Sequence, residues 1–207
     1  RLNDPLYIGL KQKRVRGQAY QEFIDEFVEA VKEVFPNVCL QWEDFLKGNA
    51  IKQLNRFRDS LCSFNDDIQG TAGVVVAGIY SALRITQQPL ASQRIVFAGA
   101  GASAQGISDL IVAAMVEDGL SQDEAVQRIW TVDSRGLCTK TREGLDDFKM
   151  KFARSAEEIK GYACKNPKAI SLEETIDNVR PTILIGTSQT AGMFSEGIVR
   201  KMTAYNE

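Results

Sequence analysis

The sequence contains no histidine among its 207 residues. Histidine is the usual general base near neutral pH and the commonest ligand of zinc in proteins. Its absence therefore excludes a histidine base, a histidine-bound zinc and a Ser/His/Asp triad within this chain. Carboxylates, lysines, tyrosines and backbone amides remain as the groups that carry any chemistry.

Cysteine, net charge and long apolar runs are also scarce. The four cysteines show no CxxC spacing and lie in apolar segments, so we expect buried thiols in a reducing compartment, the cytosol or an organelle matrix. No apolar run approaches the ~18 residues that cross a bilayer, so a membrane is not expected as a partner. A net charge of −2 argues against nucleic acid. There is no initiator methionine, and we expect a segment of a longer protein.

Apolar residues recur with helical and strand periods in alternation, which predicts an α/β fold. Residues 1–87 show helices at 18–35, about 45–58 and 71–86, and short strands at 38–42 and 61–64. The helix at 71–86 is so rich in apolar residues that we expect it to be buried on most sides. Residues 88–207 show strands at 94–98, 129–132 and 182–185, with helices at 105–118, after the Ser121 capping box and from about 195. We predict a Rossmann-like, doubly wound parallel sheet at 88–207, preceded by an αβ segment at 1–87 that carries acidic residues.

The turn after the strand at 94–98 reads Gly99-Ala-Gly-Ala-Ser-Ala104, the GxGxxA pattern of a dinucleotide-binding turn. Glycines there let backbone amides approach a pyrophosphate at the start of a helix, and Gly106 allows close packing. A later strand ends in Asp133, which could accept ribose hydroxyls, although it lies further from Gly99 than the usual ~20 residues. These features favour a cofactor site over a purely structural turn.

Two pairs of acidic residues, Glu43-Asp44 and Asp66-Asp67, follow the two short strands of the first half. Carboxylate oxygens are the ligands that Mg²⁺ and Mn²⁺ prefer. Neighbouring residues on a strand point to opposite faces, so both members of a pair can bind one ion only where the backbone turns. Spacing alone leaves open the alternative that Asp44 and Asp67 cap the helices that follow them.

Three motifs resemble the malic enzymes: Leu40-Gln-Trp-Glu-Asp-Phe45, Phe64-Asn-Asp-Asp-Ile-Gln-Gly-Thr71 and Phe97-Ala-Gly-Ala-Gly101. The likeness covers essentially the whole chain. It implies that Glu43, Asp44 and Asp67 bind the metal, that Asp66 partners the catalytic lysine and that Thr71 lies on the cofactor side.

The implied reaction is the oxidative decarboxylation of L-malate to pyruvate and CO₂, with reduction of NAD⁺ or NADP⁺ and dependence on Mg²⁺ or Mn²⁺. The family's lysine base and tyrosine acid are expected before Arg1, and its substrate-binding asparagines after Glu207. We therefore expect the isolated chain to bind dinucleotide weakly and to turn over no malate. The family usually forms dimers and tetramers, so we expect a homo-oligomer.

The cofactor contacts that we predict are Gly99, Gly101, Ala102, Ser103, Ala104, Asp133, Ser134, Arg135, Lys149, Thr187 and Ser188, together with Thr71. Ser134-Arg135 and Lys149 look like the serine, basic residue and lysine of NADP-using members. Because basic side chains suit a 2′-phosphate, NADP is favoured over NAD.

Three alternatives stay open on the sequence alone. A malolactic enzyme shares the scaffold but keeps NAD bound and releases lactate without net redox change. A second alternative is a nucleotide-binding module without catalysis. The third is the dinucleotide-binding domain of an unrelated dehydrogenase, in which the acids are only helix caps.

Overall fold

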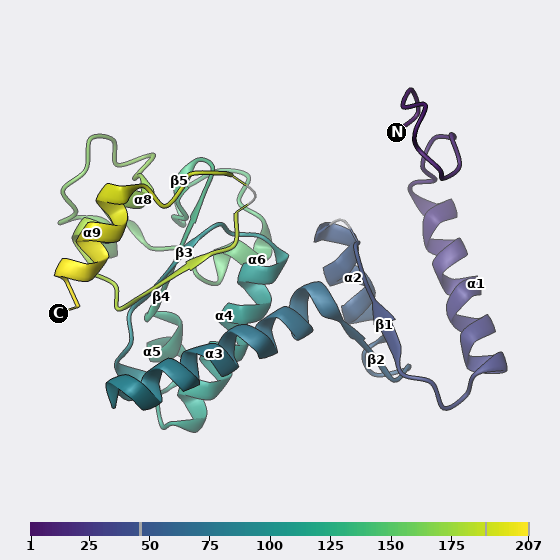
Figure 1. Ribbon diagram of the computed structural model, residues 1–207, viewed down its shortest axis with the longest axis horizontal. Helices are drawn as coiled ribbons and strands as arrows, with labels where there is room; N and C mark the ends of the chain where they lie inside the picture. Colours follow the sequence, from purple (N-terminus) through teal and green to yellow (C-terminus); the bar gives the residue numbers. More distant parts are fainter. Residues whose placement is uncertain (46, 189, 207) are drawn as a thin grey trace.

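The computed structural model describes residues 1–45, 47–188 and 190–206 (Figure 1). The elements of the first half are α1 (Gln18–Val34), β1 (Leu40–Trp42), α2 (Lys47–Phe57), β2 (Ser63–Asn65), the π-helical turn η1 (Asp66–Gly70) and α3 (Thr71–Thr86). Those of the second half are η2 (Leu90–Ser92), β3 (Ile95–Ala98), α4 (Ala102–Glu117), α5 (Gln122–Val126), β4 (Ile129–Asp133), β5 (Gly136–Leu137), α6 (Asp147–Met150), α7 (Ala156–Ile159), α8 (Leu172–Val179), β6 (Ile183–Gly186) and α9 (Glu196–Ala204). Leu46, in the helix predicted from about residue 45, lies outside the described residues.

The second half is built on a four-stranded sheet with the order β5-β4-β3-β6. β3 pairs in parallel with β4 and with β6, and the short β5 runs antiparallel to β4. The chain leaves β3 for β4 on one side and then crosses back to form β6 on the other, so the strand order reverses at β3. Ligands of such sheets bind beyond the carboxyl ends of the strands at this point.

Helices cover both faces of this sheet. Successive side chains of β3 point to opposite faces and are all apolar, so each face has apolar side chains to bury. Ile95 and Phe97 pack into one buried cluster with residues of α3, α4 and α5. Val96 and Ala98 pack into a second cluster with residues of α8 and α9. Figure 1 shows these two groups of helices on either side of the strands. The predicted Rossmann-like α/β fold is confirmed.

The first half holds a smaller, two-stranded parallel sheet, in which Leu40 lies beside Ser63 and Trp42 beside Asn65. α1 packs on it through Ile24 and Val28, which join Trp42 in a separate buried cluster. This sheet and α1 lie to one side of the larger sheet, and α3 connects the two parts (Figure 1). The chain therefore carries its acidic residues on a sheet other than the one that carries the glycine turn.

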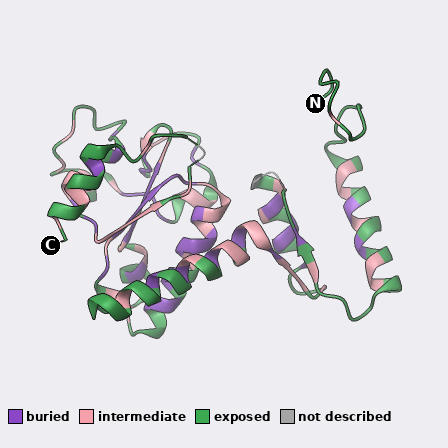
Figure 2. Ribbon diagram, in the orientation of Figure 1, coloured by how far each residue is buried: buried purple, intermediate pink, exposed green. Residues whose placement is uncertain are grey.

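The prediction that α3 is buried on most sides is wrong. Ala72, Val76 and Ile79 are buried, but Val74 is 75% exposed and Ile85 is 85% exposed. Figure 2 shows much of this helix in the colour of exposed residues. Apolar residues occur all round this helix, so no polar stripe marks its outer face. With η1, the helical segment Asp66–Thr86 has 21 residues and contains an 18-residue stretch with a mean hydropathy of 1.3. It is therefore long and apolar enough to cross a bilayer, which the sequence prediction missed. Core helices of soluble proteins meet the same criteria, and this one packs along α4.

The cysteines also differ from the prediction of buried thiols. Cys138 is buried and Cys164 is half-buried, but Cys39 and Cys62 are exposed. Both exposed residues directly precede the short strands β1 and β2. In both strands only the last residue, Trp42 or Asn65, is buried, so the amino-terminal ends that the cysteines precede lie outside the core.

Candidate functional site

The glycine turn lies where β3 ends. Gly99 has a φ of +124°, a conformation that side chains other than glycine rarely adopt. A Cβ at this residue would lie 2.7 Å from the backbone nitrogen of Ser188 and 2.7 Å from Oγ1 of Thr187. The Thr187 hydroxyl donates a hydrogen bond to the Gly99 carbonyl at 3.2 Å, and the Thr187 amide donates one to Ala98 at 2.9 Å. The carboxyl ends of β3 and β6 are thus held in contact, and only glycine fits between them.

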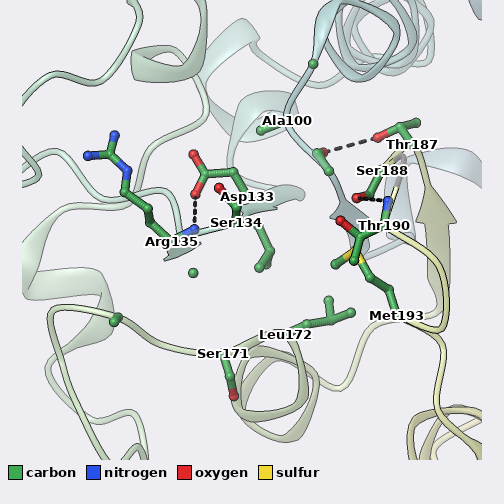
Figure 3. Close-up of a pocket in the computed structure, with 15 residues that line it drawn as sticks. Ala100, Asp133, Ser134, Arg135, Ser171, Leu172, Thr187, Ser188, Thr190 and Met193 are labelled. Carbon is green, nitrogen blue, oxygen red and sulfur yellow. Dashed lines mark hydrogen bonds between the residues drawn. The ribbon is translucent and has the colours of Figure 1, made fainter.

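A cleft of about 760 Å³ opens beside this turn (Figure 3). Its volume is in the range of small-molecule and cofactor sites. Seven predicted cofactor residues line it: Gly99, Gly101, Asp133, Ser134, Arg135, Thr187 and Ser188. Figure 3 shows Asp133, Ser134 and Arg135 on one wall and Thr187 and Ser188 on the opposite wall. The structure therefore brings the ends of β3, β4 and β6 together around one cavity.

The other predicted cofactor residues lie outside the lining of this cleft. Ala104 is 2% exposed and belongs to the core between the sheet and α4. Ala102 packs beside Ile68, and the Ser103 hydroxyl donates a hydrogen bond to the Asp67 carbonyl at 3.1 Å. Thr71 begins α3, and its backbone amide bonds to carbonyls of η1. Their predicted contact with cofactor stays a prediction.

Lys149, the remaining predicted cofactor residue, reaches the site through Asp133. Its Nζ lies 2.6 Å from Oδ2 of Asp133, and Arg142 donates to both carboxylate oxygens at 3.0 and 2.7 Å. The three side chains are only 9–12% exposed. Burial alone raises the pKa of Asp133, but hydrogen bonds from Lys149, the Arg135 amide and Arg142 outweigh it and hold the pKa below its usual range. Two cations thus surround one carboxylate at the edge of the cleft.

Sequence reasoning missed several residues of this site. Arg142 lies in the loop after β5, where no motif indicates that it binds Asp133. Ser171, Leu172 and Met193 form the floor and far wall of the cleft. Ser171 begins the capping box Ser171-x-x-Glu174, which caps α8. That pattern was a signal for a helix starting beside the sheet, but it carries no information about a ligand.

The second group of predicted site residues also comes together. Ligand oxygens of Glu43, Asp44 and Asp67 lie within 4.8 Å of one another. Asp44 has a φ of +56°, so the chain turns sharply where both acids of the first pair must face the same way. Among the side chains that the structure describes, none forms an ion pair with these three, and only Gln41 donates to Glu43, at 2.7 Å. A set of uncompensated hard oxygens suits a divalent cation such as Mg²⁺ or Mn²⁺.

The alternative that Asp67 caps a helix does not fit the geometry. The cap of η1 is Asn65, whose side-chain oxygen accepts a hydrogen bond from the Ile68 amide at 2.9 Å. The Asn65 amide donates to Gln69 at 3.0 Å, which closes the turn from the other side. Asp66 and Asp67 lie inside the turn, and a Cβ at Gly70 would collide with the Asp66 carboxylate.

The acidic turn η1 rests directly on the first turns of α4. A Cβ at Gly106 would lie 2.8 Å from Cγ2 of Ile68 and 2.9 Å from its carbonyl carbon. Together with the hydrogen bond from Ser103 to Asp67, this close approach joins the helix that follows the glycine turn to the turn that carries Asp66 and Asp67. The close packing expected of Gly106 is present, with η1 as the partner.

Comparison with known proteins agrees with these features. Residues 68–207 match the family described as "Malic enzyme, NAD binding domain", and residues 1–58 match "Malic enzyme, N-terminal domain". The NADP-dependent malic enzyme of Homo sapiens is 49% identical over 100% of this chain and 34% of its own length. The NAD-dependent malic enzyme 3 of Bacillus subtilis is 44% identical over 99% of this chain and 36% of its own length. The solved malic enzyme of Entamoeba histolytica superposes with a TM-score of 0.62 at 27% identity, over 82% of this chain and 32% of that one. The chain spans about a third of the length of these relatives.

Proposed function

Because this chain belongs to the malic enzyme family, we propose that it supplies the metal carboxylates and the dinucleotide cleft for oxidative decarboxylation of L-malate to pyruvate and CO₂ with reduction of NAD(P)⁺. The observation that carries the proposal is the convergence of Glu43, Asp44 and Asp67 within 4.8 Å. A binding module without catalysis, or an unrelated dehydrogenase, has no need of such a cluster.

Each part of the site has a distinct task in this proposal. Backbone amides of the turn at Gly99 and Gly101 bind the cofactor pyrophosphate at the start of α4. The three carboxylates hold Mg²⁺ or Mn²⁺, which when bound acts as a Lewis acid on substrate oxygens. Asp66 positions the lysine that the resemblance implies as the proton acceptor. We also propose that the protein forms a homo-oligomer, which exposed apolar side chains on α1 and α3, such as Phe23 and Val74, support. A reducing compartment completes the proposal.

Titration with Mn²⁺ tests the metal site. Asp67→Asn removes a negative charge from the cluster without changing its size, so Mn²⁺ affinity should fall by at least ~10-fold, equivalent to about 1.4 kcal/mol. Asp59→Asn is the matched control, since Asp59 is an exposed acid before β2 and outside the cluster. This variant should bind Mn²⁺ with unchanged affinity. Calorimetry measures both. Because no turnover is expected of the isolated chain, malate turnover with Mn²⁺ is measured in the full-length protein, where Asp67→Asn should lower it in parallel. Unchanged Mn²⁺ binding in Asp67→Asn would remove the proposed metal site.

We further propose that NADP is preferred to NAD. In support, Asp133 is already neutralised by Arg142 and Lys149, so its carboxylate does not repel a 2′-phosphate, and exposed Arg135 adds positive charge. Lys149→Gln should weaken NADP⁺ binding about 10-fold while changing NAD⁺ binding little, because a charge-assisted bond contributes about 1.5–3 kcal/mol. Lys151→Gln, whose partner is Asp109, is the control. Tighter binding of NAD⁺ than of NADP⁺ by the unaltered protein would overturn the preference.

The malolactic alternative predicts a different product balance. A malolactic enzyme returns the hydride to the substrate and releases lactate, so no reduced cofactor accumulates. Absorbance of NAD(P)H at steady state, measured on the full-length protein with malate and Mn²⁺, distinguishes the two. Accumulation of reduced cofactor in step with pyruvate supports the malic enzyme reaction, and lactate without reduced cofactor overturns it.

A further inference from the structure

Cys39 and Cys62 lie side by side at the start of the small sheet. The parallel register that places Leu40 beside Ser63 continues backwards by one residue to these two cysteines. The Leu40 amide donates to the Cys62 carbonyl at 2.9 Å, so the pairing of the two segments extends to this point. Neighbouring strands lie about 4.8 Å apart, within the separation of Cα atoms that a disulfide spans.

The two thiols are in contact with each other and are exposed to solvent. Both residues are exposed, and a hydrogen bond between their side chains is the main cause that raises the pKa of Cys39. Cys138, in contrast, is buried, and burial raises the pKa of its thiol as well. Oxidants in solution reach exposed thiols before buried ones. The pair is therefore the most exposed thiol site among the four cysteines, since Cys164 is half-buried and Cys138 is buried.

We propose that Cys39 and Cys62 form a peroxide-reactive dithiol that closes to a disulfide between β1 and β2. One thiol loses its proton and the thiolate attacks the peroxide, so that an S–O bond forms and the O–O bond breaks. The hydroxide that leaves takes up the proton that the thiol released, which gives one water and a sulfenic acid. The second thiol then attacks that sulfur, the S–S bond forms, the S–O bond breaks and a second water leaves. The two sulfurs lose two electrons, and the two peroxide oxygens gain them. Because the second thiol is in contact, closure competes with further oxidation to sulfinic acid.

The position of the pair gives closure a structural consequence. β1 (Leu40–Trp42) lies between Cys39 and the pair Glu43-Asp44, and β2 (Ser63–Asn65) lies between Cys62 and the pair Asp66-Asp67. A disulfide between the residues before the two strands thus joins the strands that the acidic cluster follows, about 13 Å away at ~3.3 Å per residue over four residues. The bond closes the loop that contains α2, so oxidised protein should unfold at higher urea concentration than reduced protein.

Peroxide treatment followed by mass spectrometry tests the proposal. The unaltered protein should lose about 2 Da per chain, one disulfide's worth of hydrogen. After trypsin, the fragments 33–47 and 59–84 should be joined and should separate with dithiothreitol. Free thiols should fall from four per chain to two.

Three variants complete the test. Cys138→Ser should still form the linked fragments. Cys39→Ser and Cys62→Ser should form none, and the remaining cysteine of each should gain oxygen instead, because its resolving thiol is absent. Linked fragments that contain Cys138 or Cys164, disulfides found only between chains, or sulfinic acid at Cys62 in the unaltered protein would overturn the proposal.

Discussion

Gly106→Ala should destabilise the protein, although alanine is the better helix former. In the interior of α4, alanine is favoured over glycine by about 0.5–1 kcal/mol. The new Cβ would however lie 2.8 Å from Cγ2 and 2.9 Å from the carbonyl carbon of Ile68. Part of this contact is backbone, so no side-chain rotation relieves it, and overpacking of this kind costs about 1–3 kcal/mol. We expect a net loss of about 1–2 kcal/mol in the free energy of unfolding, since the clash exceeds the gain in propensity.

Gly78→Ala in α3 provides the matched control, because no atom lies within 4 Å of its added Cβ. There the helix propensity acts alone, and the free energy of unfolding should rise by about 0.5–1 kcal/mol. Urea unfolding followed by circular dichroism measures both variants under the same conditions. Opposite signs for two identical substitutions are the expected result. If Gly106→Ala is as stable as Gly78→Ala, α4 does not support η1 in the way described.

Three further predictions concern stability and cofactor binding. Hydrogen bonds from the Lys165 and Ser171 amides lower the pKa of Glu174 to about 2, so the stability that it contributes is present above its usual pKa and is lost as pH falls towards 2. Glu174→Gln should therefore flatten the urea-unfolding free energy between about pH 4.5 and 2. Arg154→Met should cost about 2–4 kcal/mol in urea unfolding, because the buried guanidinium bonds the carbonyls of Gln127 and Ile129, pairs with Glu158 and stacks on Trp130. Arg200→Met, in an exposed pair with Glu196, should cost less than about 1 kcal/mol, and equal losses would contradict the role of burial. Gly99→Ala should weaken NAD(P)H binding at least ~10-fold in a fluorescence titration, because its φ and its contact with Ser188 exclude a Cβ, and unchanged affinity would place the cofactor elsewhere.

Much of the fold could be predicted because local patterns and tertiary structure agree. The helix at 71–86, the strand before Gly99 and the capping box at Ser121 all occur where periodicity and cap residues indicate. The glycine turn and the acidic pairs were found from short motifs, and the parallel order of β4, β3 and β6 then brings Asp133 and Thr187 to the same cleft.

The remainder depends on contacts between distant segments, which periodicity does not encode. Arg142 binds Asp133 only because the loop after β5 folds back over β4. The Ser103 hydroxyl donates to the Asp67 carbonyl, a partner that the glycine motif does not indicate. Asp67 has the position of a helix cap in the sequence, whereas Asn65 takes that role once η1 forms. The exposed face of α3 was missed because its composition is uniform round the helix.

The contact between α4 and η1 has a thermodynamic consequence. Ile68 of η1 packs against Gly106 of α4, where a Cβ would clash, and the Ser103 hydroxyl donates to the Asp67 carbonyl. The turn that carries the acidic residues and the helix that follows the glycine turn are therefore in direct contact. A ligand that shifts either η1 or α4 must also displace the other. The affinities for metal and for dinucleotide are then coupled, and such coupling is reciprocal by linkage. Whatever factor bound dinucleotide imposes on Mn²⁺ affinity, Mn²⁺ must therefore impose on dinucleotide affinity. Gly106 is the position at which that factor can be altered without changing a residue of the carboxylate cluster or a predicted cofactor contact.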